Sequence, residues 1–271
     1  MQKKTIFITG TSSGIGRATV TFFLGKGWNV VATMKSPEKE TEFQNSDSLL
    51  LEKVDVTDSQ SISQAFNAGI KKFGKIDAIV NNAGYGLLGP LENTTEEQVR
   101  AQFDVNVLGT VNTIRIALPH FRKNNGGKII NIASMLGRIT LPFMSIYAAS
   151  KHAVEGLSED LYYELKGFNI QIKIIEPGNI RTDFFTNSLI RAENDTVNAY
   201  DSYWHPYMKN MIARGNGGKD PMLAAEVIYQ AVNDNSTRLR YKVDRTAKML
   251  IFLRKIHPLW LFQWIIRRVV K

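Results

Sequence analysis

The residues with the clearest potential for chemistry are Tyr147 and Lys151, which stand four positions apart in a chain of 271 residues. On a helix, residues i and i+4 share a face, so the phenol and the ammonium would lie within reach of each other. A free tyrosine has a pKa of about 10, and a neighbouring cation lowers that pKa by favouring the phenolate. Such a tyrosine exchanges a proton with an alcohol or carbonyl oxygen. The same spacing also occurs on solvated helix faces, so the pair needs support from the rest of the chain.

Two polar residues upstream of this pair stand where a site could use them. Ser134 comes just after the apolar run Lys128–Ile132. In open α/β sheets, ligands bind at the carboxyl ends of parallel strands, which is where this hydroxyl would lie. Asn106 lies within the helix-like segment Thr95–Arg122. The ordinary interpretation of such an asparagine is an inward polar residue satisfied by the helix backbone.

A glycine-rich stretch near the start of the chain is typical of an anion-binding turn. Gly10, Gly14 and Gly16 follow the apolar run Thr5–Thr9 with the spacing G-x-x-x-G-x-G. A strand that ends in a glycine-rich turn and opens a helix directs backbone N–H groups and the positive end of the helix dipole at a phosphate. The Pro-Gly and Asn-Ala-Gly stretches found further along also punctuate loops that bind nothing.

The same turn also matches the nucleophile elbow of serine hydrolases, because residues 10–14 read G-x-S-x-G around Ser12. That interpretation requires an acidic residue and a histidine downstream, together with an oxyanion hole from an earlier strand–loop connection. Ser12 follows the first strand of the chain, so no earlier connection supplies the hole. We therefore favour the phosphate-binding interpretation, with Ser12 as a small residue that lets the anion approach.

Short apolar runs alternate with amphipathic segments along most of the chain. Seven candidate strands are Thr5–Thr9, Asn29–Thr33, Leu49–Val54, Ile76–Asn81, Lys128–Ile132, Gln171–Ile175 and Leu239–Val243. The main candidate helices are Ile15–Gly25, Ser59–Phe73, Thr95–Arg122 and Tyr147–Lys166. The strands are apolar on both faces, as buried parallel strands are. The pattern predicts an α/β protein with a doubly wound Rossmann fold, whose seven-stranded parallel sheet has helices on both faces.

Composition excludes several classes of protein. Apolar residues make up 44% and charged residues 22% of the chain, which is ordinary for a globular protein. There is no cysteine, so disulfides, thiolate zinc sites and cysteine nucleophiles are excluded, and we expect no metal site. No apolar run is long enough to span a membrane, and the first residues lead straight into a strand rather than a signal peptide. We therefore expect a cytoplasmic protein.

The net charge of +9 is concentrated at one end of the chain. After Asp244 there is no acidic residue, while seven positive charges follow. Residues 1–244 therefore carry only +2, nine less seven. Because the basic residues belong to a terminal segment and not to a face of the whole fold, we expect no nucleic-acid partner.

Three further motifs follow candidate strands. They are Asp55-Val56-Thr57-Asp58, Asn81-Asn82-Ala83-Gly84 and Pro177-Gly178-Asn179-Ile180-Arg181-Thr182. With these motifs, the glycine-rich turn and the tyrosine–lysine pair, the chain resembles the short-chain dehydrogenase/reductase family in its single-domain form. The resemblance runs from Lys4 to about Thr182 and then weakens. It implies a nicotinamide-dependent oxidoreductase that acts on an alcohol or carbonyl group, the alternative being a cofactor-binding sensor or scaffold without turnover.

The resemblance implies a catalytic role for four residues. Tyr147 would be the general acid in carbonyl reduction or the base in alcohol oxidation. Lys151 would lower the pKa of Tyr147 and bind the nicotinamide ribose. Ser134 would donate a hydrogen bond to the substrate oxygen, where charge develops. Asn106, at a local kink of its helix, would hold a water that links Lys151 to solvent.

The resemblance also implies the residues that bind the cofactor. The glycines would admit the pyrophosphate, Ile15 would pack beneath the nucleotide, and the later motifs would contact the adenosine and nicotinamide ends. The full predicted set is Gly10, Ser12, Ser13, Gly14, Ile15, Gly16, Lys35, Asp55, Val56, Asn82, Ala83, Gly84, Tyr147, Lys151, Pro177, Gly178, Ile180 and Thr182.

The choice between NADP(H) and NAD(H) depends on the end of the second strand. An acidic residue there would bind the ribose 2′-hydroxyl and repel a 2′-phosphate. Met34 occupies that position and Lys35 follows it. Family members with a basic residue at the second position prefer NADP, although Ser13 leaves the family's other basic position without a charge. We expect NADP(H), with NAD(H) as the alternative.

Two segments remain outside the regular pattern, and we divide the chain accordingly into a dinucleotide-binding and catalytic domain, residues 1–247, and a basic amphipathic extension, residues 248–271. Residues from about 181 to 221 connect a strand to the next helix and are rich in aromatics, which favours a lid over a bulky, lipophilic alcohol or ketone. These aromatics alternatively pack against the domain or another subunit. The extension either packs on its own fold or at a subunit contact, or it lies on an anionic membrane. The family resemblance implies a homodimer or homotetramer.

Overall fold

The computed structural model describes residues 3–181, 189–192 and 198–270, and its centre is a parallel sheet. Its strands are β1 (Thr5–Thr9), β2 (Asn29–Met34), β3 (Leu49–Lys53), β4 (Ala78–Asn81), β6 (Gly127–Ile132), β7 (Ile170–Glu176) and β9 (Arg240–Lys242). Their order in the sheet is β3-β2-β1-β4-β6-β7-β9, and every neighbouring pair is parallel. The chain moves outward from β1 in one direction and then returns to build the other half from β4. The predicted doubly wound fold is confirmed.

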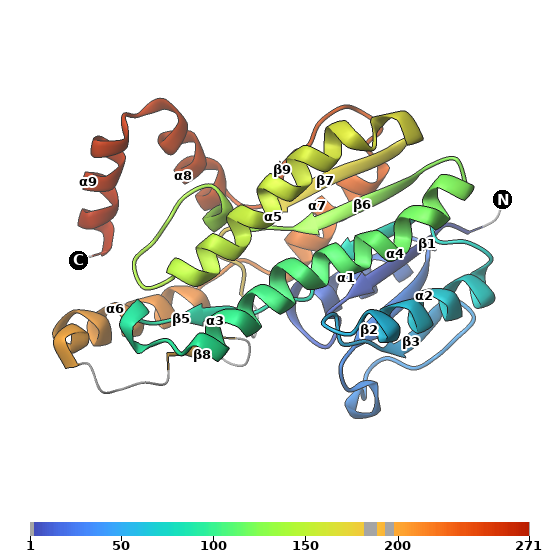
Figure 1. Ribbon diagram of the computed structural model, residues 1–271, viewed down its shortest axis with the longest axis horizontal. Coiled ribbons are helices and arrows are strands. Elements are labelled where there is room, and N and C mark those ends of the chain that lie inside the picture. Colours follow the sequence, from blue (N-terminus) through green and yellow to red (C-terminus); the bar gives the residue numbers. More distant parts are fainter. Residues whose placement is uncertain (1–2, 182–188, 193–197, 271) are drawn as a thin grey trace.

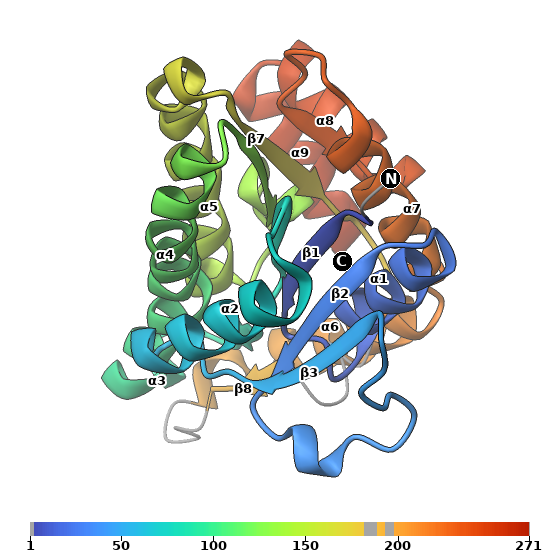
Figure 2. The same cartoon turned by 90° about the vertical axis from the view of Figure 1, so that its right-hand side faces the viewer.

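Helices cover both faces of this sheet (Figures 1 and 2). On one face lie α1 (Gly14–Gly25) and α7 (Pro221–Asn233), and on the other lie α2 (Ser59–Phe73), α4 (Gly109–Lys123) and α5 (Ser145–Glu164). Strands that are apolar on both sides require this double cover, because each face would otherwise expose branched side chains to water.

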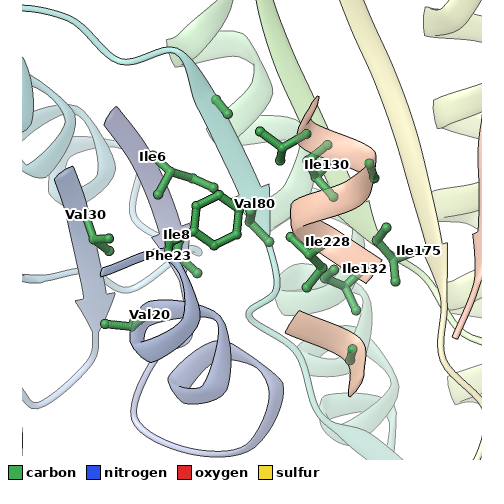
Figure 3. Close-up of a cluster of buried hydrophobic side chains, with 14 of the residues drawn as sticks. Ile6, Ile8, Val20, Phe23, Val30, Val80, Ile130, Ile132, Ile175 and Ile228 are labelled. Atoms are coloured by element: carbon green, nitrogen blue, oxygen red, sulfur yellow. The ribbon is translucent and has the colours of Figure 1, made fainter. Parts of the chain in front are cut away.

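The core on the α1 and α7 face is built from β-branched strand residues and apolar helix residues (Figure 3). Ile6, Ile8 and Val80 from neighbouring strands contact Phe23 of α1 and Ile228 of α7, and all five are fully buried. Because β1 and β4 lie at the middle of this core, the ends of these two strands are held firmly. Those ends carry the glycine-rich turn and the Asn81–Gly84 motif.

The long helix predicted over Thr95–Arg122 is interrupted. The structure has α3 (Glu96–Phe103), then a π-helical turn (Asp104–Leu108) that contains Asn106, and then α4. The wider turn changes the direction in which side chains leave the helix, and π-turns of this kind often mark functional sites. The kink expected from the family resemblance therefore lies at Asn106.

Elements outside the main sheet form a second layer beyond its carboxyl edge. Two short strands that the sequence analysis did not predict, β5 (Gly86–Leu88) and β8 (Leu189–Arg191), pair in parallel. Figure 1 shows α6 (Asp201–Asn216) beside them, while α8 (Arg245–Ile256) and α9 (Leu259–Val270) stand above α6 at the same end of the molecule. Their apolar residues, among them Leu88, Tyr207 and Phe262, join one cluster with Tyr147. The catalytic candidate thus lies between the sheet and this layer.

A buried charged cluster fixes α5 against the far edge of the sheet. Arg240 of β9 contacts Glu155 and Glu159 of α5, with Nε and Nη2 at 2.9 and 2.7 Å from the respective carboxylates. Glu176, the last residue of β7, is fully buried with its Oε1 atom 3.8 Å from the same Nε. Arg138 lies 3.8 Å from Glu155. Burial, with the nearby Glu155 carboxylate, raises the pKa of Glu176 to about 7.

We predict that Glu176→Gln stabilises the protein at alkaline pH. A raised carboxyl pKa means that the folded state holds the proton more tightly, so stability is lost as pH rises from about 4.5 through about 7. The neutral amide does not lose a proton, and its advantage should grow to about 1–3 kcal/mol at pH 8. Thermal unfolding between pH 5 and pH 8 measures this difference.

The control for this prediction is Glu159→Gln, which removes a carboxylate from the half-exposed end of the same cluster. Its stability relative to the parent protein should change little with pH. A stability difference for Glu176→Gln that stays constant, or that turns against the variant as pH rises, would contradict the prediction.

Candidate active site

The glycine-rich turn between β1 and α1 has the backbone geometry of a phosphate-binding loop. Gly10 and Gly14 have φ angles of +69° and +55°, which residues with a side chain adopt only at a cost. Ser13 precedes α1 in an extended conformation, and its side chain makes no capping hydrogen bond to the described residues. The N–H groups of the first turn of α1 are therefore left for an anion, so the residues present fit the pyrophosphate of a dinucleotide.

Close backbone packing holds this turn against the end of β4. The side-chain amide of Asn82 donates hydrogen bonds to the carbonyl oxygens of Thr9 and Gly10, at 2.9 and 2.8 Å. The Thr9 hydroxyl in turn accepts hydrogen bonds from the backbone N–H groups of Asn82 and Ala83, both at 3.0 Å. A Cβ atom on Gly16 would lie 2.2 Å from the Gly10 carbonyl oxygen. Gly16 thus serves the packing of the turn.

Three of the four predicted catalytic side chains converge below the end of β6. Helix α5 carries Tyr147 and Lys151 on one face, and both residues are buried. The hydroxyl groups of Tyr147 and Ser134 are hydrogen-bonded to each other. The Lys151 ammonium donates to the Ile132 carbonyl oxygen at 2.8 Å and lies 5.8 Å from the centre of the Tyr147 ring. A phenol, a hydroxyl and an ammonium thus meet at one point of the sheet edge.

The direction of the Tyr147 pKa shift differs from the expectation. Burial raises the pKa of Tyr147 to about 12, and the hydrogen bond with Ser134 lowers it by less. Burial also lowers the pKa of Lys151 to about 8. The ammonium is directed at the Ile132 carbonyl, and its effect on the phenol does not outweigh the loss of solvation. In the protein by itself, Tyr147 therefore keeps its proton at neutral pH.

Asn106 is connected to the site by hydrogen bonds to the backbone of Tyr85 and to the Ser150 hydroxyl. Its carboxamide oxygen accepts from the Tyr85 N–H at 3.1 Å, and its Nδ2 donates to the Tyr85 carbonyl and to the Ser150 hydroxyl, both at 3.0 Å. Ser150 donates to the carbonyl of Tyr147 at 2.7 Å. A Cβ atom on Gly84 would lie 3.0 Å from the Asn106 oxygen and 3.7 Å from the Lys151 nitrogen. Asn106 thus joins the loop after β4 to the first turn of α5.

One continuous cavity of about 1210 Å³ connects the glycine-rich turn to the tyrosine–lysine pair and to the outer layer. This exceeds the usual size of a single small-molecule pocket. The predicted site residues that line it are Gly10, Ser12, Ser13, Gly14, Ile15, Lys35, Val56, Asn82, Ala83, Gly84, Ser134, Tyr147, Lys151, Pro177, Gly178 and Ile180. Residues that should meet one elongated ligand thus share one space.

Three predicted residues among those that the structure describes do not line the cavity. Gly16 and Asn106 act through packing and hydrogen bonds, as described above. The Asp55 carboxylate accepts from the N–H and hydroxyl groups of Thr57, at 3.0 and 2.8 Å, and pairs with Lys35 at 2.9 Å. Thr182 lies outside the described residues, as do Phe184 and Phe185 of the predicted lid.

The cavity has residues at both ends that the sequence analysis missed. Near the end of β2, Arg17 and Glu40 line it and form an ion pair with each other. At the other end its wall is mainly apolar and comes from four separate segments; it includes Met135, Leu136, Leu141, Met144, Tyr207, Met211, Met249, Leu250, Leu253, Ile265 and Ile266. Tyr207 and Met211 belong to the segment from about 181 to 221 that the sequence analysis expects to form a lid. The other wall residues have no sequence signal beyond general apolarity, because no fixed spacing relates residues that are so far apart in the chain.

Comparison with known proteins gives a consistent assignment. Residues 4–192 match the short chain dehydrogenase family. The chain is 36% identical over 270 residues to the uncharacterized oxidoreductase YusZ of Bacillus subtilis, covering 95% of each protein. It is 35% identical to the 3-ketodihydrosphingosine reductase of Bacteroides thetaiotaomicron over 92% of this chain and 91% of that protein.

Solved structures show the same relationship in three dimensions. A short-chain dehydrogenase from Streptomyces avermitilis superposes with a TM-score of 0.82 at 31% identity over 92% of each chain. The NADP-bound structure of ElxO superposes with a TM-score of 0.73 at 26% identity, over 91% of this chain and 99% of that one. The site geometry, the fold and these relatives agree: the chain belongs to the short-chain dehydrogenase/reductase family and is an NAD(P)-dependent oxidoreductase.

Proposed function

We propose that this protein uses NADPH to reduce the carbonyl group of a bulky, lipophilic substrate. The observation that carries the proposal is the single cavity, which begins at the phosphate-binding turn, passes Tyr147 and continues between apolar side chains of α6, α8 and α9. A site of this shape suits a dinucleotide and an elongated apolar molecule end to end. The reacting carbonyl would lie where the two meet.

The residues that would hold the cofactor lie along the first half of the cavity. The N–H groups at the start of α1 would bind the pyrophosphate, and Val56 and Ala83 would bound the adenosine. Lys151 would bind the nicotinamide ribose hydroxyls, with Pro177, Gly178 and Ile180 beside the ring. We propose that Asp55 contacts the adenine and that Thr182 reaches the carboxamide. When bound, the cofactor supplies the hydride that reduces the carbonyl carbon.

Tyr147 would protonate the substrate oxygen as negative charge develops there. The phenol carries a proton at neutral pH that it can deliver to the substrate oxygen. Ser134, hydrogen-bonded to Tyr147, would donate to the same oxygen. Alcohol oxidation would use the same groups in reverse, with the phenolate as the base. The choice of reduction therefore rests on the proposed preference for NADPH.

Asn106 would act by positioning the loop after β4 and the first turn of α5. Its hydrogen bonds to Tyr85 and Ser150 fix both segments beside Lys151. We also keep the expected water between this region and Lys151 as part of the proposal. The Asn106 oxygen and the Lys151 nitrogen lie on the same side of Gly84.

Basic groups at the end of β2 support the preference for NADPH. Lys35 and Lys39 line the cavity there, and the acidic residue that would repel a 2′-phosphate is replaced by the buried Met34. Lys35 is 64% exposed and pairs with Asp55, so its ammonium is free to turn toward a phosphate at little cost. Arg17, in contrast, is held by Glu40 and Glu42.

The apolar end of the cavity supports a lipophilic ketone as substrate. Leu136, Met144, Met211 and Ile266 surround the space next to Tyr147, where a polar substrate would lose solvation without hydrogen bonds in return. The Bacteroides relative named 3-ketodihydrosphingosine reductase makes a long-chain ketone a candidate substrate class.

We also propose that residues 181–221, α6 included, form the lid over this end of the cavity. Residues 248–271 would extend a catalytic domain of residues 1–247. We propose further that the protein forms a homodimer or homotetramer and that it is located in the cytoplasm.

We predict that Tyr147→Phe abolishes turnover and leaves cofactor binding intact. Removing the acid should lower kcat with NADPH by about 1,000-fold, within the range for general acid catalysis. The panel of substrates would include ketosteroids, retinal, aliphatic ketones and quinones. NADPH fluorescence titration should give the same Kd within about twofold, since Phe retains the ring. Substantial activity in this variant would contradict the mechanism, and an inactive wild-type protein that binds NADPH would favour the sensor alternative.

We predict that Lys35→Ala weakens NADPH selectively. Loss of the cation that faces the 2′-phosphate should raise KM for NADPH about tenfold and change KM for NADH by less than about twofold. The matched control is Lys53→Ala. Lys53 is an exposed lysine on β3 that lies in register with Met34 of β2 and does not line the cavity. Equal changes for the two cofactors would show that Lys35 does not read the phosphate.

We predict that Met211→Ala separates large from small substrates. This α6 side chain lines the apolar end of the cavity, so its loss should raise KM for a long-chain ketone about tenfold. KM for a short aliphatic ketone should stay within about twofold, because such a ketone does not reach Met211. An equal effect on both substrates would mean that Met211 packs the fold and makes no substrate contact.

A further inference from the structure

The last two helices have an inner and an outer face of opposite character. In α9, Phe262 and Ile266 are only 3% and 8% exposed and pack in the cluster that contains Tyr147. Trp260 and Trp264, one helical turn apart, are 68% and 52% exposed. The expectation that this segment packs on its own fold therefore describes one face of α9 and leaves two tryptophans in solvent.

Helix α8 continues the same exposed surface. Met249, Phe252 and Ile256 follow one another at helical spacing and are each more than half exposed. We define the outer face as the exposed apolar side chains of both helices: Met249, Phe252, Ile256, Leu259, Trp260 and Trp264. Figure 1 shows α8 and α9 at one end of the molecule, beyond the sheet and next to the carboxyl end of the chain. Scattered exposed apolar residues are ordinary, but here six lie on two consecutive helices that contact each other.

Basic residues are distributed along the same two helices, and no acidic residue follows Asp244. Lys248, Lys255, Arg267 and Arg268 are exposed, and none of them forms an ion pair with a described residue. Arg268 lies over the Trp264 ring, at 4.6 Å from its centre. On α9, Trp260, Trp264, Arg267 and Arg268 have the i, i+4, i+7 and i+8 spacing of one helix face.

The same two helices form the wall of the cavity. Met249, Leu250 and Leu253 of α8 and Ile265 and Ile266 of α9 line it. Only these two helices therefore separate a molecule bound against the outer face from the apolar end of the site. Met249 belongs to both surfaces, because it is more than half exposed and also lines the cavity.

We propose that the outer face of α8 and α9 docks on an anionic lipid bilayer and opens the apolar end of the cavity toward it. Tryptophan at the boundary and arginine or lysine beside it is the pattern of an interfacial helix, in which each cation near an anionic surface strengthens the binding. Within the described residues, no helix is long and apolar enough to cross a bilayer, so the contact is peripheral. A second copy of the chain is disfavoured as the occupant, since pairing two outer faces would oppose cations with cations.

The route for substrate rests on the proposed function, whereas the docking surface itself does not. A lipophilic ketone partitions into the bilayer, where its concentration is far higher than in water. A cavity that adjoins the membrane would take such a substrate directly from the lipid. The consequence is a KM that depends on whether the substrate is presented in anionic vesicles.

The test uses flotation of the full chain with phosphatidylcholine vesicles, with and without phosphatidylglycerol. The wild-type protein should bind only the anionic vesicles, and binding should fall as salt rises from about 0.1 to about 1 M. Brominated lipid should quench its tryptophan fluorescence. Trp260→Ser combined with Trp264→Ser should reduce vesicle binding about tenfold and remove the quenching. Arg267→Gln combined with Arg268→Gln should reduce binding by a similar factor and flatten the salt dependence.

The matched control is Lys71→Gln combined with Lys123→Gln, which removes the same number of charges from exposed positions on α2 and α4. Binding of this control should change by less than about twofold, because the lysines lie on the opposite side of the fold. Equal loss in control and test variants would show attraction by net charge and overturn the docking surface. The docking surface would also be overturned if the wild-type chain did not bind vesicles. The same holds for a concentration-dependent self-association that the tryptophan substitutions abolish.

Turnover of a short, water-soluble ketone verifies that the variants are folded, since Trp260 and Trp264 do not line the cavity. Vesicle binding without any carbonyl turnover would refute the proposed function and leave the docking surface standing. Turnover without vesicle binding would refute the docking surface and leave the proposed function standing. A lipophilic ketone in anionic vesicles should show a KM about tenfold lower for the wild-type protein than for the tryptophan variant, while kcat stays equal.

Discussion

The structure depends on the joint between the ends of β1 and β4, where the two halves of the sheet meet. Asn82 uses one amide group to bind the carbonyls of Thr9 and Gly10, and Thr9 returns hydrogen bonds to the backbone after β4. Because its glycines have no side chain, the turn packs directly against the backbone that follows β4. The first-turn N–H groups of α1 therefore face the cavity in a fixed direction. The positions at which a ligand contacts the rest of the cavity therefore depend on the position of this turn.

A second constraint is that the reacting groups are buried before any substrate arrives. Burial raises the pKa of Tyr147 and lowers the pKa of Lys151, so it disfavours the charged form of both groups. The π-helical turn at Asn106 contributes to this arrangement, since it directs one amide at both Tyr85 and Ser150. The family pattern thus predicts which residues come together, while the direction of the pKa shift depends on solvation that only the folded chain determines.

The main sheet could be predicted from the sequence, because branched apolar strands with short connections are compatible with few topologies. The motifs at the strand ends could also be found from the sequence, because each motif is local. Prediction from the sequence failed where structure depends on distant partners. The pairing of β5 with β8 joins segments about a hundred residues apart, and neither strand has a pattern of its own. The ion pair of Arg17 with Glu40 and the apolar wall of the cavity are likewise products of tertiary packing. The break at the π-helical turn follows from the family resemblance but not from apolar periodicity, which continues through it.

The C-terminal helices show how one short segment meets two requirements at once. Phe262 and Ile266 bury themselves beside Tyr147, so α9 is held by the same cluster that shapes the apolar end of the site. Once that face is fixed, helical geometry forces Trp260 and Trp264 to the opposite side. A chain under no other constraint would gain solubility from polar residues there. Large aromatic side chains are costly to leave in water, and their presence beside arginine is best explained by a surface that is apolar within and anionic at its boundary.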